Sequence, residues 1–378
     1  MRYAMIMAGG TGTRLWPMSR ASMPKQLVPF IDADERGGSR RSLLQVAAGR
    51  LDGIVPEDKR YICTNESYRP QIRETMPAFG DQQILGEPVG RDTVNAVGFA
   101  AAVLQKLDPD AVFAVLTADQ LIRPEAKFRD LMDLAYKLVE NDPTRLVTFS
   151  IKPTCPATGF GYVERGGRIP GFDERATFVE RFVEKPSLEK AQAYVESGAF
   201  GWNSGMFVWK ASTIMDCLRR YKPESYDGLM KIAGAWGTPD QQKVLNEVYP
   251  TLPKISVDYA IMEPASREQK RAQGTPSEKS AVKVCTIEAD IDWLDVGSWP
   301  SYGETLEPDT DGNRVSGDAQ LLRGKKNIVV NDEAGHTLAL VGCENMIVVH
   351  TKEATLIMPA SKAQDLKQLH EQLPDEVR

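Results

Sequence analysis

The chain has 378 residues and a formal net charge of −6 at pH 7, with 42% hydrophobic and 26% charged residues. That length suits one large domain plus a small one, and the composition is that of an ordinary globular protein. The negative balance argues against broad attraction to nucleic acid or to an anionic membrane, so we expect neither as a partner.

The cysteines and histidines exclude several classes of site. Five cysteines lie far apart with no Cys-x-x-Cys pair, which favours buried thiols in a reducing compartment over disulfides or a zinc site. The three histidines, His336, His350 and His370, come late in the chain, so the earlier part has no histidine nucleophile. No apolar stretch of about 18 residues is present. We therefore expect a cytoplasmic protein without a membrane span or signal peptide.

The first residues form an apolar run, Tyr3–Ala8, followed by Gly9-Gly-Thr-Gly-Thr-Arg14. The run predicts a buried parallel strand that ends in a loop at one edge of a sheet. Glycines there permit close approach of a ligand, and successive backbone N–H groups form an anion-binding concavity. Arg14, Arg20 and Lys25 add positive charge, and arginine binds two phosphate oxygens at once. These features predict a phosphate-binding loop.

Two commoner glycine-rich motifs do not fit this loop. A Walker loop requires a Gly-Lys pair, and a dinucleotide fingerprint requires a third glycine where Leu15 stands. A glycine-rich turn with surface charges is the simpler alternative. It would need neither the arginines nor the triplet Pro24-Lys25-Gln26.

The stretch Gly9-Gly-Thr-Gly-Thr-Arg-Leu-Trp-Pro17, with Pro24-Lys25-Gln26, resembles the signature of the sugar-1-phosphate nucleotidylyltransferases. Within them it is similar to the mannose-1-phosphate guanylyltransferases, whose pattern has Trp-Pro after the arginine. Further patches of resemblance run to residue 373, so it covers nearly the whole chain. The resemblance implies that Arg14 and Lys25 are catalytic and that the nucleotide is bound by Ala8, Gly9, Gly10, Thr11, Gly12 and Thr13.

From residue 3 to about 150, short apolar runs alternate with helical patterns. The expected strands are Tyr3–Ala8, Arg60–Thr64, Gln82–Gly86, Val112–Thr117 and Leu146–Ile151. The expected helices are Ser42–Leu51, Glu66–Met76, Thr93–Leu107 and Glu125–Glu140. This rhythm predicts an α/β, Rossmann-like fold, with a mixed, mostly parallel sheet between helices and its ligand beyond the carboxyl ends of the strands.

The stretch from Gly86 to Asn95 follows the third expected strand and precedes an alanine-rich helix. Its proline and glycine favour a tight turn, and Asp92 or Thr93 would cap the helix, so a plain capping turn is one interpretation. The stretch also resembles the base-recognition segment of the family. That resemblance implies that guanine lies near Glu87, Gly90, Arg91 and Asn95.

Asp119 follows the apolar strand that ends at Thr117. A single aspartate after a strand is most often a helix cap or a turn residue. Its alignment with the glycine-rich loop favours a position facing phosphates, where neighbouring anions require a cation such as Mg²⁺. The family pattern has a histidine next, whereas this chain has Gln120, so a role for that histidine does not transfer.

Residues 152–210 predict strands and loops that carry a sugar site. Glu184 and Lys185 alone would be a solvated pair at a strand edge, but with the stretches 158–163 and 202–207 they match the sugar-phosphate site of the family. The resemblance implies that Glu184 and Asn203 bind sugar hydroxyls, which need mixed donors and acceptors, and that Lys185 binds the phosphate. Gly161 would pack against the sugar.

Residues 211–250 predict helices at 211–221 and 241–249, with Met230 and Trp236 in the core. The segment 256–263 resembles a family segment that lines the sugar pocket, which implies a binding role for Asp258. A helix N-cap also explains Asp258.

A strand at 281–288 leads to an acidic loop that ends in Trp293-Leu-Asp-Val-Gly-Ser-Trp299. A solvated acidic turn is the simpler interpretation. Resemblance to the family's Trp-x-Asp-Val-Gly-Ser-Trp motif implies instead that Asp295 is a catalytic residue and the second Mg²⁺ ligand, opposite Asp119.

After residue 306 the composition changes. Apolar stretches spaced by about ten residues predict short stacked strands, closed by a helix at 361–373; they are Ile328–Val330, Leu338–Val341, Met346–Val349 and Thr355–Met358. We therefore predict a catalytic domain at 1–305 and a small domain at 306–378. The resemblance implies that this second domain is β-helix-like and is used for self-association, so we expect a homodimer.

The resemblance implies that the phosphate of mannose 1-phosphate attacks the α-phosphorus of GTP in line, with Mg²⁺ assistance, giving GDP-mannose and pyrophosphate. The attacking oxygen is already anionic, so the enzyme must mainly hold two anions together and neutralise developing charge. One alternative keeps the fold but uses another sugar 1-phosphate, such as a heptose 1-phosphate, or another nucleoside triphosphate. The other alternative is a non-catalytic regulator, which the presence of Lys25, Asp119 and Asp295 disfavours.

Overall fold

The computed structural model describes residues 1–10, 12–29, 31, 40–275 and 281–378. The chain forms two compact units, and neither is continuous in sequence. The first unit comprises Met1–Gly9, Ala47–Thr117 and Ile122–Trp293, and the second comprises Gly10–Val46, Ala118–Leu121 and Leu294–Arg378. The predicted catalytic domain at 1–305 thus contributes to both units, and a domain boundary after residue 305 stays a prediction.

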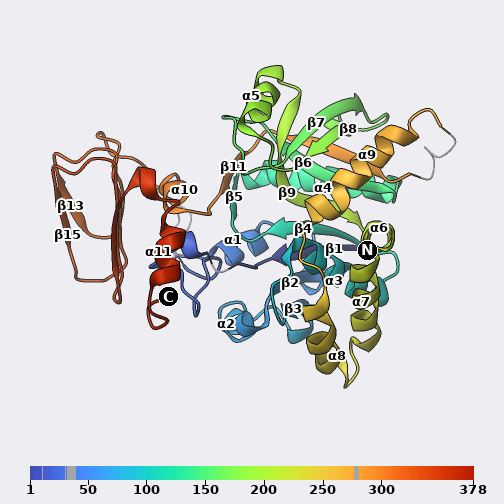
Figure 1. Cartoon of the computed structure of the whole chain (residues 1–378), viewed down its shortest axis with the longest axis horizontal. Coiled ribbons are helices and arrows are strands. Elements are labelled where there is room, and N and C mark those ends of the chain that lie inside the picture. Colours follow the sequence, from blue (N-terminus) through green and yellow to red (C-terminus); the bar gives the residue numbers. More distant parts are fainter. Residues whose placement is uncertain (11, 30, 32–39, 276–280) are drawn as a thin grey trace. The chain divides into compact units, whose positions relative to one another are not determined.

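The first unit contains a large mixed sheet (Figure 1), which within the described residues has nine strands. Their order is β3 (Ile84–Glu87), β2 (Arg60–Asn65), β1 (Arg2–Met7), β4 (Val112–Thr117), β9 (Phe200–Lys210), β6 (Arg145–Ile151), β10 (Lys283–Ala289), β8 (Ala176–Val183) and β7 (Tyr162–Arg168). Strands β3, β2, β1 and β4 are parallel neighbours, and so are β6 and β10. Strand β9 runs antiparallel to both β4 and β6. This arrangement confirms the predicted α/β class with a mixed, mostly parallel sheet.

Helices alternate with these strands along the chain. They are α1 (Leu43–Gly49), α2 (Arg69–Thr75), α3 (Asp92–Leu107), α4 (Glu125–Asn141), α5 (Leu188–Ser197), α6 (Ala211–Tyr221), α7 (Pro223–Ala235), α8 (Gln241–Val248) and α9 (Glu263–Ala272). Two short strands, β5 (Gln120–Arg123) and β11 (Asp292–Asp295), pair with each other. Within the part of the chain that the structure describes, no helix is both long and apolar enough to span a membrane.

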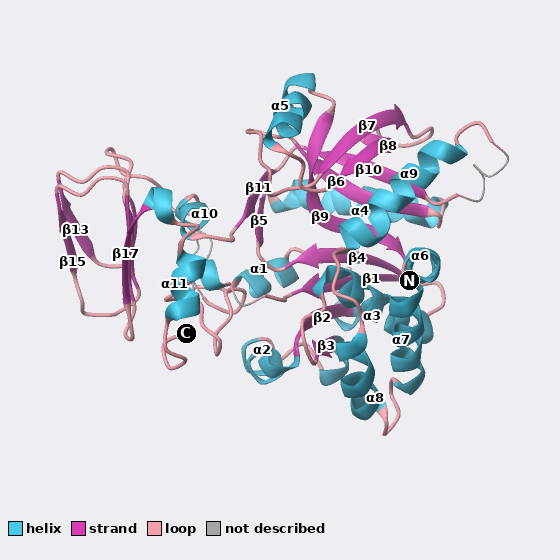
Figure 2. Cartoon of the chain, in the orientation of Figure 1, coloured by secondary structure: helices cyan, strands magenta, loops and turns pink. Residues whose placement is uncertain are grey.

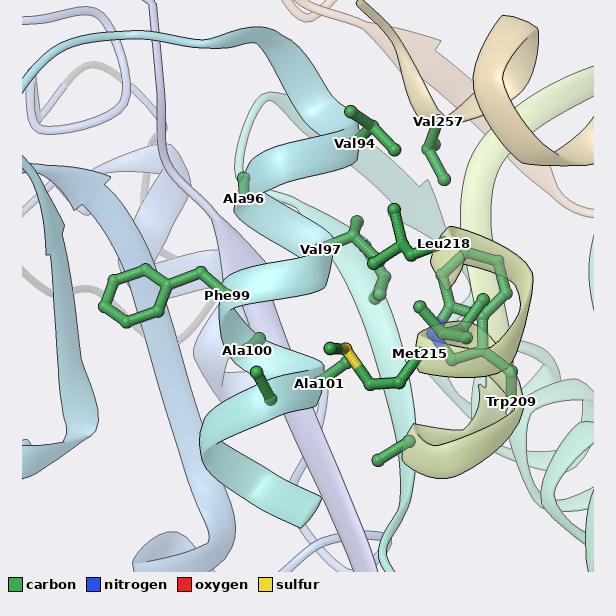
Figure 3. Close-up of a cluster of buried hydrophobic side chains, with 14 of the residues drawn as sticks. Val94, Ala96, Val97, Phe99, Ala100, Ala101, Trp209, Met215, Leu218 and Val257 are labelled. Carbon is green, nitrogen blue, oxygen red and sulfur yellow. The ribbon is translucent and has the colours of Figure 1, made fainter. Parts of the chain in front are cut away.

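The core of the first unit lies where α3, α6 and α7 pack together beside β1 and β4. Figure 3 shows this packing around α3, with Val97 beside Leu218 of α6 and Met215 of α6 reaching toward Ala101. Gly98 makes the close approach possible, because a Cβ there would lie 2.8 Å from Cδ1 of Leu218 and 2.5 Å from Cδ1 of Leu229. Neighbouring residues of β1, such as Met5 and Ile6, are both buried, so both faces of the sheet are covered.

Most predicted elements are present, with ends shifted by a few residues. Helix α7 was not predicted as a separate element, although Pro223 is well tolerated in a first helical turn. Met230 on that helix is 42% exposed, so its prediction as core was wrong, whereas Trp236 is buried as predicted. The last helix is shorter than predicted, because Ala360–Lys362 form a separate 3-10 turn before α11 (Leu366–Gln372).

The C-terminal part of the second unit consists of short stacked strands, among them β13, β15 and β17 in Figure 2. One sheet contains β12 (Arg314–Ser316), β14 (Ile328–Asn331), β16 (Met346–His350) and β17 (Thr355–Pro359); β13 (Ala319–Leu322) pairs with β15 (Leu338–Val341). Asparagines link successive turns, since Asn327 Nδ2 donates to Asn313 Oδ1 at 2.9 Å and Asn327 Oδ1 accepts from Met346 N at 2.9 Å. The repeated parallel pairing confirms the predicted β-helix-like domain.

Candidate functional site

The glycine-rich loop begins where β1 ends. Ala8 is buried, and its carbonyl accepts a hydrogen bond from Thr64 Oγ1 at 2.9 Å. In the second unit, Gly12 has φ 67° and precedes the 3-10 turn Thr13–Leu15. A Cβ on Gly12 would lie 2.6 Å from Cβ of Lys25, so only glycine leaves space for that lysine. Of the predicted nucleotide-binding residues, Thr11 lies outside the described residues.

Contacts within the second unit hold the segment that directly follows this loop. The indole Nε1 of Trp16 donates to Val377 O at 2.7 Å, and Trp299 Nε1 donates to Trp16 O at 2.9 Å. Arg20 forms a 2.8 Å ion pair with Glu353. The segment after the predicted phosphate-binding loop is therefore supported by residues near the end of the sequence, which sequence reasoning did not foresee.

Four charged residues that the sequence singled out come together in the second unit. Lys25 is only 9% exposed, and its Nζ lies 2.7 Å from Asp119 Oδ2 and 3.4 Å from Val296 O. The backbone N–H of Val296 donates to Asp119 O at 2.9 Å, which ties the segment after Asp295 to Asp119. Arg14 and Asp295 both approach Gly297, because a Cβ there would lie 3.4 Å from Arg14 Nη2 and 3.5 Å from Asp295 Oδ2. We call Arg14, Lys25, Asp119 and Asp295 the charged cluster.

The surroundings of Asp295 in the charged cluster disfavour its ionised form. Burial and the nearby Asp119 carboxylate raise the pKa of Asp295 to about 6, although Lys25 and Arg14 act in the opposite direction. A cation that joined the two carboxylates would relieve this repulsion.

The donor set of the charged cluster fits a hard divalent cation. Mg²⁺ is usually held by one or two carboxylates, with substrate phosphates and water completing its shell. Asp119 and Asp295 provide such a pair. Among the described residues there is no group of three or more His, Cys, Asp or Glu side chains that would hold a metal by itself.

A second group of predicted residues meets in the first unit. Asn203 Nδ2 donates to Asp258 Oδ1 at 2.9 Å, and the Asn203 backbone N–H donates to Gly161 O at 2.8 Å. Lys185 Nζ lies 2.9 Å from Glu184 Oε1, and that carboxylate is largely buried. We call Gly161, Glu184, Lys185, Asn203 and Asp258 the polar cluster. The alternative of a solvated Glu184–Lys185 edge pair does not describe it, because Glu184 packs against Gly161.

Asp258 does not cap a helix. It is the first residue of a π-helical turn, Asp258–Met262, whose preceding residue is Val257. Burial and the neighbouring Glu184 carboxylate raise the pKa of Asp258 to about 7. Its contact with Asn203 shows that it belongs to the polar cluster.

Asp258→Asn is expected to flatten the pH dependence of stability. Because the pKa of Asp258 is raised to about 7, protonated Asp258 contributes to the stability of the fold. This contribution is fully present below about pH 4 and is lost as pH rises through about 7. Asparagine keeps the acceptor for Asn203 and does not ionise. The free energy of unfolding is measured with urea for both proteins. As the pH rises from about 4 to about 8, the value for the variant should increase relative to that of the wild type. A constant difference across that range would contradict the prediction.

The turn predicted to recognise a base is held by hydrogen bonds of buried side chains. Glu87 is buried, its Oε1 accepts from Tyr249 Oη at 2.5 Å, and burial raises its pKa to about 7. Asn95 is 0% exposed and its Nδ2 donates to Arg91 O and to Pro253 O, at 3.1 and 2.7 Å. The exposed residues of the turn are Val89, Gly90 and Asp92.

The predicted cap of α3 was wrong. The helix begins at Asp92 after Arg91, and the Arg91 side chain makes no cap hydrogen bond. Among the described residues, the Asp92 carboxylate accepts only from the adjacent Thr93 N, at 2.8 Å. Thr93 Oγ1 instead accepts from Val257 N at 2.9 Å. Sequence reasoning also missed Tyr249, since a tyrosine at a helix end carries no local signal of its distant partner.

The chain is similar to known proteins over nearly its whole length. A family model described as nucleotidyl transferase matches residues 3–312, and one described as a mannose-phosphate isomerase/GMP-like beta-helix domain matches residues 317–373. The chain is 35% identical over 381 residues to a mannose-1-phosphate guanylyltransferase of Klebsiella pneumoniae, covering 100% of this chain and 75% of that protein. A mannose-1-phosphate guanylyltransferase of Escherichia coli strain K12 is 36% identical over 378 residues, covering 98% and 73%.

A solved structure is similar over the same extent. The crystal structure described as mannose-1-phosphate geranyltransferase from Thermus thermophilus has a TM-score of 0.82 and 27% sequence identity. The match covers 98% of this chain and 98% of that chain.

Proposed function

The chain belongs to the nucleotidyl transferase family, and we propose that it transfers the guanylyl group of GTP to mannose 1-phosphate. The products are GDP-mannose and pyrophosphate. The activity named for two relatives, of which the chain covers 75% and 73%, supports this substrate pair. The observation that carries the proposal is the charged cluster, in which a buried lysine and an arginine accompany two carboxylates beside a glycine-rich loop.

The reaction exchanges one phosphoanhydride bond for another. A phosphate oxygen of mannose 1-phosphate forms a bond to the α-phosphorus of GTP, while the bond from that phosphorus to the bridging oxygen of the β-phosphate breaks. The electron pair of that bond leaves with pyrophosphate. No general base is required, because the attacking oxygen is already anionic.

The residues of the charged cluster act mainly by neutralising charge. We propose that Arg14 and the loop N–H groups bind the leaving pyrophosphate and that Lys25 contacts the α-phosphate. Charge spreads onto the phosphate oxygens in the transition state, so fixed cations stabilise that state more than the separated substrates. Burial of Lys25 strengthens this effect, since less water screens its ammonium group.

Members of this family generally use a divalent metal, and we propose that Asp119 and Asp295 hold Mg²⁺. When bound there, the ion would neutralise phosphate charge and help to orient the nucleotide. The two carboxylates fit such an ion, because Asp295 is buried and lies near the Asp119 carboxylate, and both conditions raise its pKa.

We propose that the polar cluster binds the sugar phosphate. Glu184 and Asn203 provide an acceptor and a mixed donor–acceptor, which suit hydroxyls that both give and accept hydrogen bonds. Lys185 provides a cation for the phosphate, and it is about half exposed at its side chain. Nucleotide binding is proposed for the glycine-rich loop, including Thr11, and for the turn that contains Glu87, Gly90, Arg91 and Asn95.

Gly161→Ala is expected to raise the KM for mannose 1-phosphate by at least about tenfold, because small displacements of binding groups are costly. The added Cβ would lie 2.4 Å from Glu184 Oε2, so the carboxylate must move. The KM for GTP should change little. Gly159→Ala is the matched control, since its Cβ would meet no atom within 4 Å. Equal KM values for the two variants would contradict the assigned role of Glu184.

We also propose that the β-helix-like domain mediates a homodimer. Two paired residues of β13 and β15, Leu322 and Val341, are 60% and 70% exposed, and Ile357 on β17 is 66% exposed. Exposed apolar side chains on a small domain favour burial against a second copy. Light scattering of the purified protein gives its mass directly, and a monomer at micromolar concentration would contradict this proposal.

The activity is tested by incubating the protein with mannose 1-phosphate, Mg²⁺ and one nucleoside triphosphate at a time. We expect pyrophosphate release with GTP and much less with ATP, CTP or UTP. Release with GTP and a heptose 1-phosphate, but not with mannose 1-phosphate, would replace the sugar in the proposal. Absence of release with every pair would overturn it.

A further inference from the structure

Residues 249–257, which we call the strap, connect two parts of the first unit that the proposed function assigns to different substrates. At one end, Tyr249 Oη donates to Glu87 Oε1 at 2.5 Å. Arg91 Nη2 donates to Pro250 O, and Asn95 Nδ2 donates to Pro253 O at 2.7 Å. The strap therefore binds the turn that is proposed to meet the base, through three side chains of that turn.

The other end of the strap leads directly into the polar cluster. Val94 N donates to Ile255 O at 3.2 Å, and Val257 N donates to Thr93 Oγ1 at 2.9 Å. The next residue is Asp258, whose carboxylate accepts from Asn203. Thr93 thus fixes the backbone one residue before a member of the polar cluster, although Thr93 itself belongs to the base turn.

The strap is anchored to the core along its length. Tyr249, Leu252 and Val257 are buried, and Leu252 packs against Gly228, where a Cβ would lie 2.5 Å from its Cδ2. Figure 3 shows Val257 facing Val94 at the start of α3. Because these anchors and the hydrogen bonds hold the same nine residues, a shift at one end is resisted at the other.

We propose that the strap couples the two substrate sites, so that GTP and mannose 1-phosphate each favour the binding of the other. This inference rests on the proposed function for the assignment of the two ends. A ligand that orders the base turn also orders the strap, and a second ligand at the polar cluster then loses less conformational freedom when it binds. Such a coupling is reciprocal, so either ligand reports on it. Thr93 and Tyr249 act as positioning residues in this arrangement.

The coupling is measured by calorimetry with GDP and mannose 1-phosphate, two ligands that do not react by the proposed route, because GDP has no pyrophosphate to release. The coupling factor is the Kd of GDP without mannose 1-phosphate divided by its Kd with a saturating amount. Repulsion between the phosphates of the two ligands lowers this factor equally in every variant. Comparison between variants therefore isolates the contribution of the strap.

Thr93→Val removes the acceptor for Val257 N–H and keeps the shape of the side chain. We expect the coupling factor to fall by about fivefold relative to the wild type, which is at the low end of typical couplings. Thr213→Val is the matched control, since Thr213 Oγ1 donates to Pro143 O at 2.7 Å away from the strap. It should leave the factor unchanged. Thermal unfolding of both variants checks that they are folded.

Tyr249→Phe provides a second test at the other end of the strap. It removes the hydroxyl that donates to Glu87, and Tyr221→Phe, which removes a hydroxyl that donates to Glu268 at 2.7 Å, is its control. A reduced factor in Thr93→Val and Tyr249→Phe, but in neither control, supports the coupling. Factors equal to that of the wild type in both strap variants overturn it. Failure of both ligands to bind the wild type would overturn the proposed function itself and the inference with it.

Discussion

Lys25→Ala is expected to lower turnover by about a hundredfold or more, which is the usual effect of removing one charged contact to a transition state. Lys25 is the most buried cation of the charged cluster, and it already contacts Asp119 at 2.7 Å. Its loss leaves Asp119 without the cation that contacts it, and the α-phosphate without the cation proposed to bind it. Steady-state rates of pyrophosphate release measure the effect.

The stability of this variant should change much less than its activity. The Asp119 side chain is 31% exposed, so water can solvate the carboxylate that loses its partner. Lys210→Ala is a matched control, because Lys210 forms an ion pair of the same 2.7 Å length with Asp110. It should keep near-normal turnover. Near-normal turnover in Lys25→Ala as well would remove Lys25 from the mechanism.

Asp295→Asn is the second substitution with a large expected effect, and we expect it to lower turnover by about a hundredfold or more. The substitution keeps the size of the side chain and removes one of the two charges proposed to hold Mg²⁺. It also removes the repulsion between Asp295 and Asp119, which together with burial raises the pKa of Asp295. The variant should therefore be at least as stable as the wild type near neutral pH, while it is far less active.

Opposite changes in activity and stability distinguish a functional carboxylate from a structural one. The control is Asp292→Asn, which alters an exposed aspartate of the same strand β11. It should leave both properties unchanged. If Asp295→Asn instead unfolded at lower urea concentration and kept its turnover, the carboxylate would be a structural group of the loop and not a metal ligand.

Local sequence was sufficient for elements whose pattern is strong. The apolar run before the glycines predicted β1, because it is short, unbroken and followed by turn residues. The alanine-rich stretch predicted α3, because it is long, contains no proline and is rich in good helix formers. Helix α7 was missed as a separate element, since its mixed composition and first proline resemble a connection between helices. The same local patterns, together with the family resemblance, singled out Lys25, Asp119 and Asp295 as site residues.

Only the tertiary structure decided which side chains meet and which are covered. A sequence does not show that Asp119 lies beside Asp295, because that contact depends on backbone pairing between distant segments. It likewise shows Glu87 and Asn95 as polar residues in a turn, whereas the fold buries both and gives their hydrogen bonds to the strap. The physical reason is that the functional group of each residue is known from the sequence alone. Burial and long-range hydrogen bonding depend instead on the packing of the whole fold.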